Sequence, residues 1–313
     1  MKPTLYIAPI KGITDSIYHH IYNKHFQGFH GALTPFLSTK KQDALKNKYL
    51  KEHSPLKEGS FTVIPQILSN DADFFLSIAI PLSQRGYNEI NWNLGCPYPT
   101  AVNRSKGAGL LPQKEKILSF LEKTTTNKDF SLSIKCRLGL VDPDEILELI
   151  PTFNEFKLNQ IIIHPRTAPE MYDGDLHLDI FKECVKELKH PVVYNGDIFT
   201  IEDFNKTNDS LKDQQTYMLG RGAVIDPFLP EKILNIFESN EDEEKKRFQN
   251  FHHDLFFRLR DKLSGDKHLL DKMKSFWIYW SQNYEDSRKT MKKIKKISSI
   301  ENYKKAVEEI TAH

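Results

Sequence analysis

The sequence predicts a (β/α)8 barrel over residues 1–239, followed by a small helical domain over residues 240–313. Eight short apolar segments alternate with helix-compatible segments in the first part, which is the pattern of such a barrel. Polar residues and glycines follow nearly all of these segments, at the positions where barrels carry their reacting groups. After about residue 240, apolar residues recur at three- and four-residue steps, and this spacing predicts packed helices.

The composition is that of an ordinary soluble globular protein. Of its 313 residues, 39% are hydrophobic and 27% are charged, which suffices for one large domain or a large and a small one. The apolar run near residue 5 is too short for a signal peptide. No stretch approaches the roughly 20 apolar residues that a membrane span needs. We therefore expect a cytoplasmic protein without membrane contact.

The eight predicted strands are short and mostly apolar, and lie at residues 5–8, 31–33, 62–67, 89–93, 131–135, 160–163, 192–194 and 217–219. Helices are predicted between most of them, at residues 72–85, 113–123, 143–156, 178–189 and 201–205. A doubly wound open sheet is the rival architecture. It usually has a glycine-rich turn after its first strand, whereas this turn reads Ala8-Pro9-Ile10-Lys11-Gly12, which favours the barrel.

The last part of the chain is mildly basic. A charged run at residues 241–246 is predicted to be a linker, and helices are predicted at residues 248–263, 269–284 and 287–297. Residues 241–313 contain 17 Lys and Arg against 13 Asp and Glu. This excess of basic residues is consistent with contact with a polyanion, and nearly as consistent with a helix face that is simply solvated.

Basic and hydrogen-bonding side chains gather where the predicted strands end. Because the carboxyl ends of barrel strands meet at one rim, we expect these groups to converge on one mouth. Bound phosphate is the simplest partner for a cationic cluster of this kind. The expected cluster consists of Lys135, Arg137, His164, Arg166 and Arg221.

The last two strands end in Asn195-Gly196-Asp197 and in Gly220-Arg221-Gly222. Barrels commonly build a phosphate site after these strands, from backbone N–H groups that glycine leaves accessible. Taken alone, Asn-Gly-Asp is typical of an ordinary turn. The pairing of the two segments favours phosphate binding.

The three cysteines are Cys96, Cys136 and Cys184, and none has CxxC or CxxH spacing. Neither a disulfide framework nor a metal site is therefore expected. Cys136 and Cys184 are predicted to be buried structural residues. Cys96 lies between a glycine and a proline where a strand ends, so we expect it to be partly exposed and reactive, as a nucleophile or as a general acid. A nucleophile would need a base, whereas an acid must stay protonated at neutral pH.

The basic, glycine-bearing segment at residues 103–109 is predicted to be a mobile flap or a solvated loop.

The motifs together closely resemble the flavin-dependent tRNA-dihydrouridine synthases, in the order of that family over residues 5 to about 230. The segments that carry the resemblance are Ala8-Pro9-Ile10-Lys11-Gly12-Ile13-Thr14-Asp15, Asn93-Leu94-Gly95-Cys96-Pro97, Gly107-Ala108-Gly109-Leu110-Leu111, Ile134-Lys135-Cys136-Arg137-Leu138-Gly139, His164-Pro165-Arg166-Thr167 with Tyr172, Pro191-Val192-Val193-Tyr194-Asn195-Gly196-Asp197-Ile198 and Met218-Leu219-Gly220-Arg221-Gly222-Ala223. The tail, with Lys272-Met273-Lys274-Ser275-Phe276-Trp277, looks like the bacterial C-type subgroup, which acts at position 16 of the tRNA D-loop. Two departures are Ile10, where the family usually has Met, and Pro165, where it usually has Gly.

The resemblance implies FMN in the barrel mouth and a two-step reaction. NADPH would reduce the flavin, which would pass hydride from N5 to C6 of uracil while Cys96 protonates C5. The flavin and its phosphate would be bound by Ala8, Pro9, Gln66, Lys135, His164, Asn195, Gly196, Asp197, Gly220 and Arg221. Residues expected to contact the substrate are Asn93, Arg137 and Arg166 in the barrel, and Arg258, Lys272 and Lys274 in the tail.

The resemblance also implies tRNA as the partner of a protein that is expected to be a monomer without metal. The uridine must leave the tRNA stack to reach the flavin. Two alternatives remain from the sequence: another FMN barrel that reduces a small molecule, and a non-catalytic RNA-binding protein on a degenerate barrel. The presence of Cys96 with Lys135 and His164 argues against the second.

Overall fold

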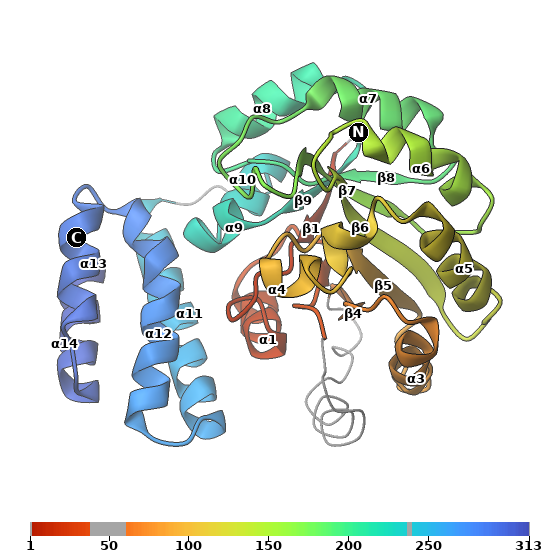
Figure 1. The fold of residues 1–313 in the computed structure, drawn as a ribbon. Helices are drawn as coiled ribbons and strands as arrows, with labels where there is room; N and C mark the ends of the chain where they lie inside the picture. The colour runs from red at the N-terminus through yellow and green to blue at the C-terminus, as the bar shows by residue number, and fades with distance from the viewer. Residues whose placement is uncertain (1, 38–60, 237–239, 313) are drawn as a thin grey trace.

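The computed structural model describes residues 2–37, 61–236 and 240–312, and their centre is a barrel of parallel strands (Figure 1). The strands are β1 (Thr4–Ile7), β2 (Gly31–Leu33), β3 (Thr62–Ile64), β4 (Gln66–Ile67), β5 (Glu89–Leu94), β6 (Ser131–Gly139), β7 (Ile161–Thr167), β8 (Val192–Tyr194) and β9 (Thr216–Leu219). Their order in the sheet is β3-β2-β1-β9-β8-β7-β6-β5-β4.

The barrel closes through β3 and β4, which are one predicted strand interrupted at Pro65. β3 pairs with β2 on one side and β4 pairs with β5 on the other. The carbonyl of Pro65 still accepts a hydrogen bond from the Asn91 N–H, at 2.8 Å. The predicted eight-stranded parallel barrel is therefore confirmed.

Two strands extend further than their apolar segments predict. β6 continues to Gly139 and β7 to Thr167, so Lys135 and His164 lie within strands and not at their ends. The pairing of β6 with β7 includes Arg137, which lies opposite His164. The register shifts between Arg137 and Gly139. Polar side chains can continue a strand here because one face of it borders the barrel mouth.

The longer helices on the outside of the barrel are α1 (Ser16–His25), α3 (Ala72–Ser83), α5 (Lys114–Thr125), α6 (Glu145–Asn154), α7 (Leu178–Glu187), α8 (Ile201–Ser210) and α10 (Leu229–Leu234). Three short helices follow strands near the mouth: α4 (Pro99–Val102) and η1 (Gly107–Leu110) after β5, and α9 (Arg221–Ile225) after β9. The five predicted helices are present as α3, α5, α6, α7 and α8, with shifted ends. Helix α1 was not predicted, although Asp15 marks its start by accepting hydrogen bonds from the Ile17 and Tyr18 N–H groups at 3.1 Å.

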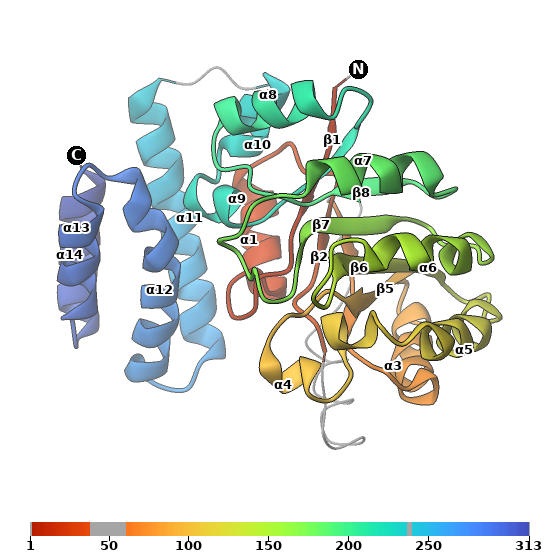
Figure 2. The ribbon, with the colours of Figure 1, turned by 45° about the horizontal axis from the view of Figure 1, so that its top comes forward.

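The tail forms a helical layer on one side of the barrel, with α13 and α14 outermost (Figures 1 and 2). Its elements are α11 (Glu241–Lys262), α12 (Asp266–Trp280), η2 (Ser281–Asn283), α13 (Ser287–Lys295) and α14 (Ile300–Thr311). The prediction of a linker at residues 241–246 is wrong, because these residues are the first turns of α11. Asn240 caps the helix by accepting from the Glu243 N–H at 2.9 Å, and the acidic first turn suits the helix dipole. Helix α14 was not predicted.

The helical layer packs directly on α1. The Tyr18 ring stacks on Phe276 of α12 at 5.9 Å, and meets Phe251 of α11 edge to face at 5.9 Å. Buried Glu231 on α10 accepts two hydrogen bonds from the guanidinium of Arg247 on α11. The layer and the barrel thus share one hydrophobic cluster. The predicted domain boundary falls beside residues 237–239, which lie outside the described part. No helix in the described ranges is long and apolar enough to span a membrane.

Candidate active site

A cavity of about 350 Å³ opens at the carboxyl ends of the strands, where the polar residues were expected to meet. All ten residues predicted to bind the flavin line it, together with Asn93, Cys96 and Arg137. The lining also includes Tyr98, Tyr172 and Tyr279, which were not among the predicted site residues. Of the expected cationic cluster, Lys135, Arg137, His164 and Arg221 line this cavity, and Arg166 does not.

The turn that carries Cys96 is held by Asn93. The Asn93 Oδ1 accepts hydrogen bonds from the N–H groups of Gly95 and Cys96, at 3.0 and 2.9 Å. Its Nδ2 donates to Gln66 Oε1 at 2.7 Å, which ties the turn to the barrel wall. Asn93, which the sequence predicts to contact substrate, is seen in the structure to position the turn that carries the thiol.

The segment after Cys96 packs behind it. The Ala108 N–H donates to the Cys96 carbonyl at 3.1 Å, and residues of η1 are buried. Gly107 has φ +58°, and a Cβ there would lie 2.6 Å from the Cys96 carbonyl oxygen. The predicted flap is consequently a buried support in its second half, because this approach leaves no room for a side chain.

Cys96 is 6% exposed, so the expectation of partial exposure is wrong, although the residue still lines the cavity. Burial raises the pKa of the Cys96 thiol, against the lowering effects of the Tyr98 N–H, Lys11 and Arg137. The thiol is therefore protonated at neutral pH. This is the state that a general acid requires, and a nucleophile would need the thiolate.

Two basic residues of the cavity wall, Lys135 and His164, lie on the neighbouring strands β6 and β7. Burial and the nearby Arg137 lower the pKa of Lys135 to about 8. Among the described residues, the Lys135 ammonium has neither a carboxylate nor a hydrogen-bond partner. Burial, followed by the charges of Arg137, Lys135, Arg166 and Arg221, lowers the pKa of His164 well below its usual value, so its ring is neutral. The wall thus presents an unpaired cation beside a neutral imidazole.

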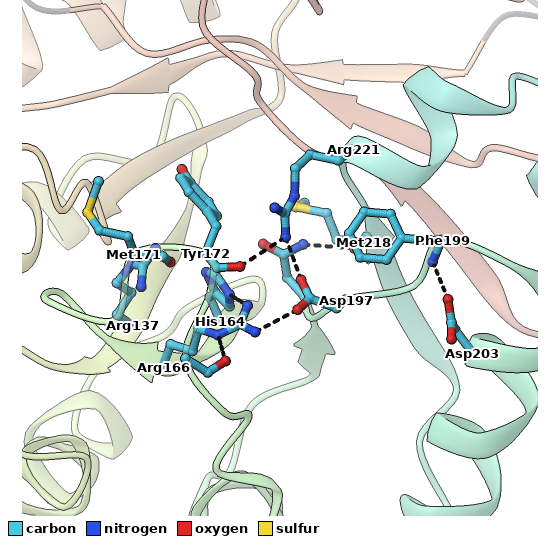
Figure 3. A network of polar contacts seen from close by, with 12 residues as sticks. Arg137, His164, Arg166, Met171, Tyr172, Asp197, Phe199, Asp203, Met218 and Arg221 are labelled. Atoms are coloured by element: carbon cyan, nitrogen blue, oxygen red, sulfur yellow. Dashed lines mark hydrogen bonds and ion pairs between the residues drawn. The ribbon is translucent and has the colours of Figure 1, made fainter. Parts of the chain in front are cut away.

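A carboxylate connects two arginines at the edge of this wall (Figure 3). Asp197 pairs with Arg166 at 2.6 Å and with Arg221 at 2.7 Å. Arg166 also donates to the Gly174 carbonyl at 2.6 Å and lies 3.3 Å from the His164 Nε2. Arg166 is buried outside the cavity lining, so the structure does not bring it to the predicted substrate position. Arg221 is the more exposed arginine and faces the cavity.

Arg137 lines the cavity but is bound by backbone carbonyls. It donates to Gly95 at 3.2 Å, to Thr167 at 2.6 Å and to Met171 at 2.5 Å. Met171 has φ +49°, which is unusual for a residue with a side chain. Arg137 therefore stabilises a strained turn, and the following Tyr172 reaches the mouth.

The glycines at the end of β8 and the start of α9 allow close backbone approach. A Cβ on Gly196 would lie 2.0 Å from the Tyr194 Oη, and one on Gly222 would lie 2.1 Å from the Ile198 carbonyl oxygen. Asn195 is fixed by a 2.8 Å hydrogen bond from its Nδ2 to the Met218 carbonyl. These two turns and Arg221 form one compact corner of the cavity.

The predicted tail residues are distributed differently. Lys272 is bound to the barrel, donating to the Gly12 carbonyl at 2.7 Å and to Asp15 at 2.8 Å. Lys274 donates to the carbonyls of Lys295 and Ile297 at the end of α13. Arg258 is exposed on α11. No group of three His, Cys, Asp or Glu within the described ranges is placed to bind a metal.

Comparisons with known proteins agree with the motifs. A family model described as dihydrouridine synthase (Dus) matches residues 6–312. A tRNA-dihydrouridine(16) synthase of Neisseria meningitidis serogroup B is 28% identical over 240 residues, which cover 74% of this chain and 71% of the relative. A tRNA-dihydrouridine(16) synthase of Cupriavidus necator is 23% identical over 249 residues, covering 77% and 76%. A probable tRNA-dihydrouridine synthase of Staphylococcus epidermidis is 23% identical over 287 residues, covering 82% and 84%.

Solved structures support the barrel. An old yellow enzyme homologue from Zymomonas mobilis superposes with a TM-score of 0.52 at 12% identity, covering 76% of this chain and 90% of that one. Morphinone reductase gives 0.50 at 10% identity, covering 76% and 87%. At these identities the likeness concerns the fold alone.

Proposed function

The chain belongs to the dihydrouridine synthase family, and we propose that it reduces a uridine in tRNA to 5,6-dihydrouridine. The observation that carries this proposal is the joint presence of a protonated thiol and an unpaired ammonium in one cavity, at Cys96 and Lys135. The names of the relatives support tRNA as substrate, and support position 16 in the D-loop as the site.

The cavity fits FMN in its chemistry. The unpaired Lys135 ammonium would gain an electron-rich partner from the flavin ring, with Gln66 and His164 beside it. The corner of Asn195, Gly196, Gly220 and Arg221 suits a phosphate, since glycine exposes backbone N–H groups and a guanidinium adds charge. Asp197 carries the wrong charge for phosphate. We propose that it instead orients Arg221 toward the phosphate.

FMN held by these residues and reduced by NADPH would supply the hydride for C6 of uracil. The chain supplies the proton: the Cys96 thiol gives it to C5 and is left as a thiolate. Its burial makes the thiolate unfavourable, so recovery of a proton from water is favourable. Negative charge develops on C5 and on the C4 oxygen of uracil, and the cations of the wall stabilise it.

The helical layer is proposed to dock the tRNA, with the exposed Arg258 as a contact. Lys272 and Lys274 have partners within the protein, so we assign them to positioning of the layer. Binding should weaken steeply between about 50 and 200 mM salt, because phosphate contacts release counterions. A flat salt response would contradict this docking.

The function is tested by mass analysis of unmodified tRNA after incubation with the protein, FMN and NADPH. Cys96→Ala should lower the rate of dihydrouridine formation by at least about 100-fold, since it removes the general acid. Its flavin content and its affinity for tRNA should remain. Cys184→Ala is the matched control, because that cysteine is buried on α7 and outside the cavity lining. Equal rates for wild type and Cys96→Ala would refute the proposed acid.

A further inference from the structure

Three tyrosine side chains line the cavity, and two of them are exposed. Tyr98 is 47% exposed and Tyr172 is 39% exposed, both more than is usual for a large apolar ring. Tyr279 is half-buried and lines the same cavity. The three tyrosines, here named the tyrosine rim, come from the segment after Cys96, the segment after β7 and helix α12.

The members of the tyrosine rim line one cavity and are close enough to affect one another electrostatically. Burial raises the pKa of Tyr172 and that of Tyr279, and in both cases the hydroxyl of Tyr98 contributes to the rise. Tyr172 has guanidinium groups on its ring, with Arg221 at 5.1 Å and Arg137 at 5.4 Å. The rim is thus a cluster of aromatic faces from both the barrel and the helical layer.

Packing does not account for Tyr98. Within the described ranges its ring makes no contact with another aromatic ring, and its hydroxyl makes no hydrogen bond. The exposed Lys11 also lines the mouth. Aromatic faces beside cations are the arrangement that binds unpaired nucleotides, in which bases stack on rings while cations meet the backbone.

Resting on the proposed function, we propose that the tyrosine rim stacks the bases that flank the flipped uridine. Removing one nucleotide from the tRNA stack leaves its neighbours without a stacking partner. Rings at the mouth replace that partner while the uracil enters the cavity. Because Tyr279 belongs to α12, the helical layer would then complete the substrate site as well as dock the tRNA.

The test is the steady-state kinetics of Tyr98 and Tyr279 variants with unmodified tRNA and NADPH. Each of Tyr98→Ala, Tyr98→Leu and Tyr279→Leu should raise KM for tRNA by between about 5-fold and about 150-fold, the range of one lost base stack. Tyr98→Phe keeps the aromatic face and should behave as wild type. Val185→Ala is the control, because Val185 is 38% exposed on α7 outside the cavity lining.

Several outcomes would overturn the proposal that the tyrosine rim stacks the flanking bases. One is a wild-type KM for tRNA in Tyr98→Ala, and another is a KM for NADPH that rises in place of that for tRNA. A defect in Tyr98→Phe equal to that in Tyr98→Ala would assign the effect to the hydroxyl and would also overturn stacking. Tyr98 is exposed, so its variants keep the test valid if Tyr279→Leu folds poorly. A wild-type protein inactive on tRNA would refute the proposed function itself, whereas active protein with unaffected variants would refute only the rim.

Discussion

Replacement of Lys135 by Met should stabilise the protein in the absence of cofactor. Lys135 is a partly buried cation without a partner among the described residues. Burial and Arg137 lower its pKa to about 8, from 10.5. The folded state therefore disfavours the charged form, and methionine fills a similar volume without charge.

The magnitude follows from this difference in pKa, which corresponds to about 3 kcal/mol. The Lys135 side chain is only partly buried and lines the cavity, so we expect a gain of about 2 kcal/mol at pH 7. Below pH 8 the lysine is charged in both states and the full penalty applies. As the pH rises from about 8 to about 10.5, the folded state loses its proton first and the penalty disappears.

The assay is urea unfolding of the cofactor-free protein at pH 7 and near pH 10, for wild type and Lys135→Met. The advantage of the variant should be largest at pH 7 and should shrink at the higher pH. Saturating FMN should then reduce this advantage by about 1.4 kcal/mol, because the variant loses a charged contact worth about 10-fold in affinity. Lys123→Met, at an exposed ion pair with Asp73, should change stability by less than about 0.5 kcal/mol.

The reasoning would be refuted by a Lys135→Met variant that is less stable than wild type without cofactor at pH 7. It would also be refuted by a pH-independent difference between the two proteins. Either result would mean that the ammonium is compensated within the folded chain.

Three further predictions concern stability and cofactor binding. His252, whose pKa burial lowers to about 3, should make the protein lose stability as the pH falls below about 6.5, by up to about 1.4 kcal/mol per pH unit; urea unfolding of His252→Phe should show a flatter dependence. Arg247→Met should destabilise the protein by about 3–5 kcal/mol in thermal or urea unfolding, because it leaves the buried Glu231 carboxylate unpaired. Gly222→Ala should weaken FMN binding in a fluorescence titration and cost about 1–3 kcal/mol, because the added carbon would lie 2.1 Å from the Ile198 carbonyl oxygen.

The sequence predicted the residues of the cavity better than the ends of the elements that carry them. Parallel strands bring their carboxyl ends together whatever their lengths, so motifs at Gln66, Lys135 and Gly220 converge. The sequence pattern underestimates the lengths of β6 and β7, because the polar residues at their carboxyl ends are typical of loops. Their side chains border the mouth, and a one-dimensional pattern does not distinguish a cavity from solvent.

The sequence pattern does not predict side-chain contacts between segments that are distant along the chain. Asp197 forms ion pairs with both Arg166 and Arg221, and of these two arginines only Arg221 lines the cavity. Tyr279 reaches the mouth only because α12 packs on α1 and α9, which no local spacing indicates. The start of α11, in contrast, could be predicted from the sequence. Asn240 and the acidic residues after it are typical of a helix N-terminus, although the same residues also resemble a charged linker.

The central claim is that one cavity couples bound flavin to a uridine in tRNA, and an anaerobic absorption measurement tests it most directly. The protein is loaded with FMN, reduced with NADPH until the flavin absorbance is lost, and then mixed with unmodified tRNA. We predict that the flavin absorbance returns with wild-type protein, and far more slowly with Cys96→Ala. A reduced flavin that tRNA leaves unchanged, while small-molecule acceptors reoxidise it, would contradict the account.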